Sequence, residues 1–201
     1  LLLKKELESL NWCEDETIVS YQKVYDFKFD ALKKAYDRFK NKNQFKYAFQ
    51  LFQDREESWL DDYAIYMSVR EHFNMKSWDE WPDLGIKFRH KDSIIYYKKL
   101  LNDRIGFWKF LQFIFYRQWE NLKRYVNLLG ISFIGDMPIY VALDSADTWS
   151  HPDVFWLDKD AKPVCVAGCP PDFFSEEGQL WGNPLYNWDF LKSTKYEWLI
   201  E

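Results

Sequence analysis

The sequence predicts an α/β fold that is mostly helical by content. The chain of 201 residues has seven glycines, none before Gly85 and five from Gly130 onward. The first part is therefore predicted to form helices joined by short polar turns, and the last third is predicted to form loops around strands. Apolar residues recur every three or four positions before Gly130, and a short apolar run after it leads into Gly135-Asp136. These observations together favour a helical subdomain followed by part of an α/β sheet or barrel.

Residues 1–90 are predicted to form an α-helical subdomain. Asp30 and Ser58 are each placed to cap a helix, because apolar residues recur at helical spacing after them. Residues 17–29 contain β-branched and aromatic side chains without a clean period, so their structure stays ambiguous. The helices expected here span residues 1–10, 30–40, 45–52 and 58–73.

The second part, residues 91–201, is predicted to contain one strand of a barrel. A helical pattern runs over residues 91–129 with a break near 102–106, and Gly130 ends it as a C′ glycine. The apolar run 131–134 follows as a strand, with Asp136 just past its end. Helix, glycine, strand and a loop bearing a carboxylate make one step of a (β/α)8 TIM barrel. One step cannot close a barrel of eight, so the chain would hold only a partial barrel.

The C-terminal part is expected to carry loops and a small hairpin. Two apolar runs, residues 154–157 and 163–167, flank a polar turn and predict this hairpin. Residues 168–178 follow as a loop with two adjacent prolines. Asn187 or Asp189 then caps a final helix.

Composition excludes several classes of function. The net charge is −5 with a pI near 5.3 and no basic stripe, so nothing favours binding to nucleic acid. The most apolar window, residues 107–116, is broken by Lys109 and Gln112 and is too short to span a membrane. The three cysteines have no partners at metal-ligand spacing, so neither a metal nor another cofactor is expected. Few unpaired cysteines and no signal peptide fit a cytoplasmic protein.

Aromatic residues make up 20% of the chain, which is a high share. Flat aromatic faces pack against pyranose rings in sugar-binding clefts, and they equally fill hydrophobic cores. For any single aromatic residue the sequence leaves both interpretations open.

Two long motifs carry a resemblance to a known family. They are GDMPIYVALDSADTW, which begins at Gly135, and VAGCPPDFFSEEGQLWGNPLYNW, which begins at Val166. Shorter similar segments lie at residues 27–29, 59–63 and 115–119. From about Tyr21 to the end, the chain resembles the amylomaltase or 4-α-glucanotransferase family, glycoside hydrolase family 77. The resemblance implies a TIM barrel with a large α-helical insertion subdomain, here present only in part.

Retaining glycosyl transfer needs two carboxyl groups, one as nucleophile and one as proton donor. Read from the residues alone, Asp136 could pair with Asp144, Asp147 or Asp172. Aspartates in loops more often cap turns, and this interpretation is favoured for Asp144 and Asp147. The resemblance implies instead that all catalytic carboxylates lie beyond Glu201 and that Asp136 binds a sugar of the substrate.

The resemblance also implies substrate-binding roles for aromatic residues. Trp181 matches an active-site tryptophan near the bound glucan, with a core tryptophan as the alternative. Residues 168–175 match a mobile loop that arches over the cleft. The six residues expected to bind substrate are Asp136, Tyr140, Pro171, Phe173, Phe174 and Trp181.

Three positions depart from the family pattern. Phe173 stands where a tyrosine is usual, which removes a hydroxyl that could bond to glucan. Cys169 and Thr148 each stand where an aliphatic residue is common. None of the three touches the chemistry directly, but Phe173 bears on how the acceptor is recognised.

We expect a fragment of a cytoplasmic 4-α-glucanotransferase of starch and maltodextrin metabolism, since the chain begins with Leu1 and ends inside a helical pattern. Its partners would be α-1,4-glucans, maltooligosaccharides and the rest of the parent barrel. Alone, it would lack transferase activity. The alternative is a non-catalytic helical module that binds glucan or supports a neighbouring domain. A phosphate- or nucleotide-binding enzyme is disfavoured, because the chain has no Gly-rich phosphate loop.

Overall fold

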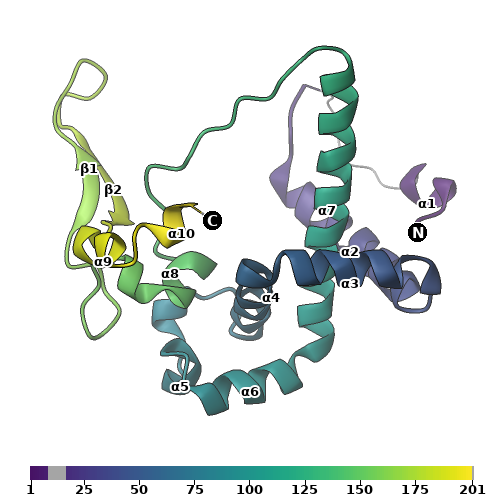
Figure 1. Ribbon diagram of the computed structural model, residues 1–201, viewed down its shortest axis with the longest axis horizontal. Coiled ribbons are helices and arrows are strands. Elements are labelled where there is room, and N and C mark those ends of the chain that lie inside the picture. Colours follow the sequence, from purple (N-terminus) through teal and green to yellow (C-terminus); the bar gives the residue numbers. More distant parts are fainter. Residues whose placement is uncertain (9–16, 201) are drawn as a thin grey trace. The chain divides into compact units, whose positions relative to one another are not determined.

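The computed structural model describes residues 1–8 and 17–200 (Figure 1). The chain divides into two compact units, one of Leu1–Leu60 with Gly106–Ser132 and one of Asp61–Ile105 with Phe133–Glu201. This division differs from the boundary expected at residue 90. The reason is that helices α4 (Glu57–His72) and α7 (Asn102–Leu128) each contribute residues to both units.

The first unit is helical and has an aromatic core. Its elements are α1 (Lys4–Glu8), α2 (Tyr21–Lys40), the 3-10 turn η1 (Asn43–Phe45), α3 (Lys46–Arg55), the start of α4 and most of α7. Phe39 is buried, and its ring centroid lies 5.2 Å from that of Phe49 and 4.8 Å from that of Phe110. Such rings remove large apolar areas from water, so this cluster stabilises the unit.

Helix α2 begins at Tyr21, and the prediction that Asp30 caps it was wrong. Contacts at i, i+4 spacing stabilise the earlier turns. The rings of Tyr25 and Phe29 stack 5.6 Å apart, and Gln22 Nε2 donates to Asp26 Oδ1 at 2.9 Å. The apolar period is missing from this stretch because much of its aromatic surface is exposed and not packed into the core.

Helix α1 is shorter than the predicted helix 1–10, whose last two residues lie outside the described part. Arg38 Nη1 and Nη2 donate to the two carboxylate oxygens of Glu6, each at 2.6 Å. These hydrogen bonds hold the pKa of the Glu6 carboxyl at about 2. Helix α4 begins at Glu57, so Ser58 lies in its first turn and is not its cap.

The end of α7 confirms the predicted C′ glycine. Gly130 has φ +78°, its N–H donates to Asn127 O at 3.0 Å, and Ile131 N–H donates to Val126 O at 3.1 Å. This bond pattern is the Schellman motif, which satisfies the last carbonyls of the helix.

The strand predicted over residues 131–134 is not formed. The segment has no regular secondary structure, and Ile134 is 98% exposed. A strand needs ladder partners for its backbone groups, and the described part of the chain supplies none here.

The second unit combines short helices with the only β-sheet found among the described residues. Its elements are the rest of α4, η2 (Trp78–Glu80), α5 (Leu84–Lys87), α6 (Lys91–Leu100), α8 (Ala146–Ser150), η3 (Pro152–Val154), β1 (Val166–Cys169), β2 (Gln179–Pro184), α9 (Trp188–Ser193) and α10 (Glu197–Ile200). The rings of Tyr66, Trp81 and Trp149 form a buried triangle with centroids 5.6 to 5.9 Å apart. A second cluster surrounds Phe155 and Leu191.

Two hairpins follow α8 where the sequence predicted one. The predicted turn is present, since Leu157 pairs with Pro163 and Asp158 N donates to Lys162 O at 2.8 Å. Residues 168–178, predicted as a loop, form the end of β1 and the tip of a longer antiparallel hairpin with β2. The glycines and prolines of this stretch hid the strand signal.

The final helix is capped as predicted but is broken. Asn187 Oδ1 accepts from Phe190 N at 3.2 Å. Lys195 and Tyr196 take positive φ, which separates α9 from α10. A break does separate α6 from α7, but it lies at Leu101, and the interval 102–106 where it was predicted is helical throughout.

Replacing Gly130 by alanine should destabilise the first unit by about 1 kcal/mol, because a Cβ strains the left-handed backbone that ends α7. The added Cβ would meet no atom within 4 Å, so only backbone strain is measured. Urea unfolding followed by circular dichroism checks this. Gly135→Ala is the control, since Gly135 has no positive φ and also has open space around it. If both substitutions lowered the free energy of unfolding equally, the assignment of Gly130 as the left-handed glycine that ends α7 would be contradicted.

Candidate carbohydrate-binding site

The second unit brings the two sequence motifs together. Asn183 Nδ2, on β2, donates to the carbonyl oxygen of Val141 at 2.9 Å. Beside this bond, the ring centroids of Tyr140 and Trp181 lie 6.3 Å apart with their planes tilted by 56°. Residues separated by about forty positions in the sequence thus share one surface.

A row of aromatic rings supports this surface from below. Tyr140 stacks against Tyr186 at 6.1 Å, and Tyr186 stacks against Phe155 at 5.5 Å. Tyr186 and Phe155 are buried, whereas Trp181 keeps 47% of its surface exposed. Trp181 Nε1 donates to Gln179 Oε1 at 2.9 Å, which limits the rotation of the indole. Tyr140 and Trp181 therefore lie at the edge of a fixed aromatic layer.

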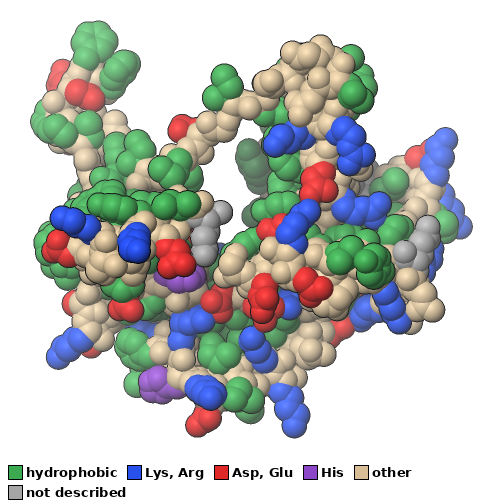
Figure 2. Space-filling view, in the orientation of Figure 1, with side chains coloured by type: hydrophobic (Ala, Val, Ile, Leu, Met, Phe, Trp, Pro, Cys, Tyr) green, Lys and Arg blue, Asp and Glu red, His purple; other side chains and the backbone are tan. Residues whose placement is uncertain are grey.

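The tip of the β1–β2 hairpin carries three of the six predicted residues. Phe173 and Phe174 are 97% and 89% exposed, and Pro171 is exposed as well. Asp172 Oδ1 accepts from the backbone N–H groups of Phe174 and Ser175, each at 2.9 Å, and so shapes the turn. Hydrophobic side chains gather at the end of this hairpin, in the upper left of Figure 2. An exposed pair of phenyl rings on an ordered turn has no packing function within this unit.

Asp136 lies apart from these groups. It is exposed, in the segment without regular secondary structure that precedes Tyr140. Among the described residues, no contact joins its carboxylate to Trp181, Phe173 or Phe174. The structure therefore brings Tyr140 and Trp181 together and pairs Phe173 with Phe174, but leaves Asp136 alone on its segment.

The other aspartates have structural environments. Asp144 Oδ1 accepts from the hydroxyl of Tyr66 at 2.5 Å, and Asp144 Oδ2 accepts from Arg70 Nη2. Burial and the bond to Asp144 raise the pKa of the Tyr66 hydroxyl. Asp147 lies exposed in the first turn of α8, and Asp172 shapes the hairpin tip. Asp172 therefore caps a turn. Turn capping was the favoured interpretation for Asp144, and it was wrong, because Asp144 accepts from the side chains of Tyr66 and Arg70 in an ion pair.

Thr148, one of the departures from the family pattern, is fully buried. Its hydroxyl donates to the carbonyl oxygen of Leu143, which also accepts from Trp78 Nε1 at 2.6 Å. An aliphatic residue could not make this bond, so the threonine adds a polar contact that holds the loop after Asp136.

Sequence reasoning missed three residues that hold this site, namely Tyr66, Arg70 and Asn183. Tyr66 and Arg70 are four positions apart and so lie on one face of α4. The sequence spacing of Tyr66 and Arg70 could have indicated a shared binding partner, but it could not have identified that partner as Asp144. Asn183 lies inside the second motif and could have been singled out as a side chain with two donors.

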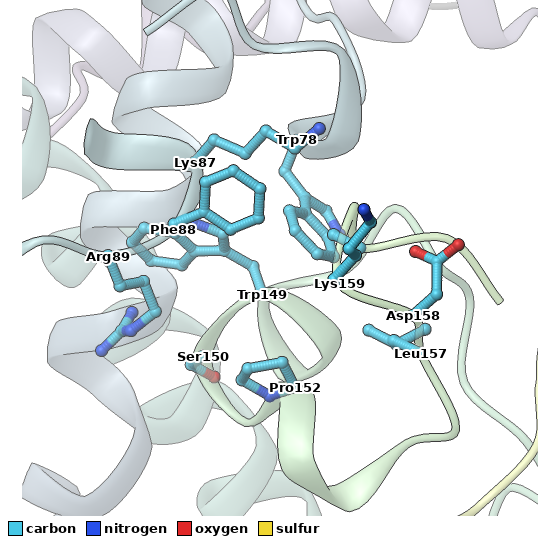
Figure 3. Close-up of a pocket in the computed structure, with 11 residues that line it drawn as sticks. Trp78, Lys87, Phe88, Arg89, Trp149, Ser150, Pro152, Leu157, Asp158 and Lys159 are labelled. Carbon is cyan, nitrogen blue, oxygen red and sulfur yellow. The ribbon is translucent and has the colours of Figure 1, made fainter. Parts of the chain in front are cut away.

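A pocket of about 320 Å³ lies elsewhere in the second unit (Figure 3). It is lined by Trp78, Lys87, Phe88, Arg89, Trp149, Ser150, Pro152, Leu157, Asp158, Lys159 and Ala161. Lys87 Nζ already donates to Asp79 O at 2.6 Å, and Arg89 Nη2 to Asp62 Oδ1 at 2.8 Å. Two of its cations are thus engaged and its tryptophans are almost wholly buried, whereas Arg89 Nη1 is buried with no hydrogen-bond partner.

No helix in the described ranges, 1–8 and 17–200, is long and apolar enough to cross a bilayer. Within the same ranges, no three His, Cys, Asp or Glu side chains come together so as to hold a metal ion.

The sequence profile of the 4-alpha-glucanotransferase family matches residues 1–201. The chain belongs to this family. It is 44% identical over 202 residues to the 4-alpha-glucanotransferase of Clostridium butyricum, covering 100% of this chain and 41% of the relative. It is 44% identical over 184 residues to the Thermus thermophilus 4-alpha-glucanotransferase, covering 90% of this chain and 37% of the relative.

A solved structure agrees with this assignment. The amylomaltase from Streptococcus agalactiae in complex with acarbose superposes with a TM-score of 0.94 at 38% identity. The match covers 99% of this chain and 40% of that one. The chain thus spans about 40% of the length of these family members.

Replacing Asp144 by alanine should lower the free energy of unfolding by about 2–3 kcal/mol, since Tyr66 and Arg70 would lose their shared acceptor. Urea unfolding measures the loss. Asp147→Ala is the matched control in the same motif and should cost less than about 1 kcal/mol, because Asp147 is exposed. If both variants lost a similar amount of unfolding free energy, the role of Asp144 as an anchor for Tyr66 and Arg70 would be contradicted.

Proposed function

We propose that these 201 residues form a substrate-binding part of a 4-α-glucanotransferase. The complete enzyme would transfer α-1,4-glucan segments between maltooligosaccharides through a covalent glycosyl-enzyme, with retention. The observation that carries the proposal is the contact between Tyr140 and Trp181, which joins the two motifs in one exposed aromatic surface. Apolar ring faces beside polar groups suit pyranose rings, which have apolar faces and hydroxyl rims.

The catalytic carboxylates would lie outside this chain. Retaining transfer needs two carboxyl groups about 5–5.5 Å apart. Asp144 is held by Tyr66 and Arg70, and Asp172 is occupied by backbone N–H groups. Asp136 is exposed and is not anchored in this way, which supports a role in sugar binding. The coverage of about 40% of the relatives leaves room for those groups in the rest of the protein.

The tip of the β1–β2 hairpin would act as a lid over the bound glucan. Phe173 and Phe174 are the most exposed aromatic side chains of the second motif. Placed over a bound sugar, their rings would exclude water, so that an acceptor hydroxyl and not water resolves the glycosyl-enzyme. Phe173 provides this cover without the hydroxyl that a tyrosine would add.

Residues 131–134 would become a strand of the complete TIM barrel. Their apolar side chains are exposed here, including Ile131 at 55% and Ile134 at 98%. Strands of parallel barrels are apolar on both faces because helices and the barrel interior cover them. The lack of a ladder partner among residues 1–8 and 17–200 is consistent with partners contributed by the remaining protein.

The purified chain should not disproportionate maltotriose, because it lacks the paired carboxylates. Chromatography of the sugar products after long incubation checks this. Formation of glucose and longer maltooligosaccharides would contradict the proposal that the catalytic carboxylates lie outside this chain. Glucan binding without turnover is the expected result. If the protein that carries this chain also bound glucan without any turnover, the alternative, a non-catalytic module, would be correct.

Replacing Trp181 by alanine should weaken binding of maltoheptaose to the chain by about threefold to tenfold, the contribution of one aromatic contact. Isothermal titration calorimetry measures the affinity. The matched control is Trp156→Ala, because Trp156 is similarly exposed, at 52%, and lies between the two motifs. Equal weakening by both variants would argue against a site at Trp181.

A further inference from the structure

The hairpin of β1 and β2 contains a β-bulge. Val166 pairs with Pro184 and Gly168 pairs with Leu180. The single residue Ala167 on β1 is therefore opposite three residues on β2, which are Trp181, Gly182 and Asn183. Bulges of this kind interrupt the ladder and redirect side chains, and they are frequent beside active sites.

Gly182 makes the bulge possible. Its φ is +78°, in the left-handed region that residues with a Cβ disfavour. A Cβ at this position would meet no atom within 4 Å, so glycine is present for its backbone conformation and not for lack of space.

The bulge directs its two flanking side chains to neighbouring positions on the first motif. Trp181 contacts the ring of Tyr140, and Asn183 donates to the carbonyl oxygen of Val141, the next residue. The Asn183 bond is partly buried, so the carbonyl has little water to replace a lost donor. This hydrogen bond therefore contributes to the spacing of Tyr140 from Trp181, together with the stacking of Tyr140 on Tyr186.

We propose that Asn183 is a positioning residue for glucan binding, which sets the Tyr140–Trp181 pair through its hydrogen bond to Val141. This inference rests on the proposed function. Asn183 need not touch the sugar, because it acts through the backbone of the first motif. An aspartate there would have nearly the same shape but would face the carbonyl with an oxygen that cannot donate.

The first experiment is made without ligand. The chain is labelled with 5-fluorotryptophan, and the ¹⁹F resonance of Trp181 is assigned by its loss in Trp181→Phe. Tyr140→Leu shows how that resonance moves when the neighbouring ring is removed. We expect Asn183→Asp to shift the Trp181 resonance in the same direction as Tyr140→Leu does. Asn183→Ala should shift it in that direction too, and this variant adds no charge.

Asn187→Asp is the matched control. It makes the same chemical change four positions along the chain, but Asn187 uses its oxygen to accept from Phe190 N, and aspartate keeps that acceptor. It should leave the Trp181 resonance unchanged. Circular dichroism checks that each variant is folded. If Asn183→Asp does not fold, Asn183→Ala is used in its place.

The second experiment measures maltoheptaose binding by calorimetry. Asn183→Asp and Asn183→Ala should each weaken it about fivefold to tenfold, while Asn187→Asp leaves it unchanged. If Asn183 variants leave the Trp181 resonance in place, or move it without weakening binding, the inference is overturned. If the unmodified chain does not bind maltoheptaose at all, the proposed function is wrong for this chain. The shifts of the Trp181 resonance would then still show whether the Asn183 hydrogen bond positions the Tyr140–Trp181 pair.

Discussion

The interaction on which the second unit most depends is the pairing of Asp144 with Tyr66 and Arg70. It joins the loop that follows Asp136 to helix α4, across more than seventy positions of sequence. Thr148 and Trp78 meet at the neighbouring carbonyl of Leu143 and close the same loop from its other side. A loop held at several polar points keeps its shape when a ligand binds, so less ordering free energy is lost on binding.

The aromatic residues of the chain divide by burial into two functions. Phe39 in the first unit and Trp149 in the second are buried and build cores. Trp181 and the phenyl pair at the hairpin tip remain exposed. Exposure of large apolar rings on ordered backbone has a cost in water, and binding of a sugar ring would recover it.

The carboxylates show how environment separates residues of one type. Asp144 is an anchor, Asp172 shapes a turn, Asp147 begins a short helix and Asp136 is exposed on a segment without regular secondary structure. Asp136 and Asp147 are both exposed, whereas the carboxylate oxygens of Asp144 are held by Tyr66 and Arg70. This distribution is the basis of the proposed role of Asp136 in binding substrate.

The sequence by itself determined much of the local structure and the family. The helical period of α7 and its C′ glycine, the cap at Asn187 and the two motifs are all local signals, because each depends on neighbouring residues. The start of α2, the β1–β2 pairing and the missing strand at residues 131–134 needed the tertiary structure, since exposed rings, bulges and ladder partners leave no periodic pattern. The same holds for the site. Its exposed aromatics could be predicted from the motifs, but the partners of Asp144 and the bond from Asn183 to Val141 depend on which distant segments meet in space.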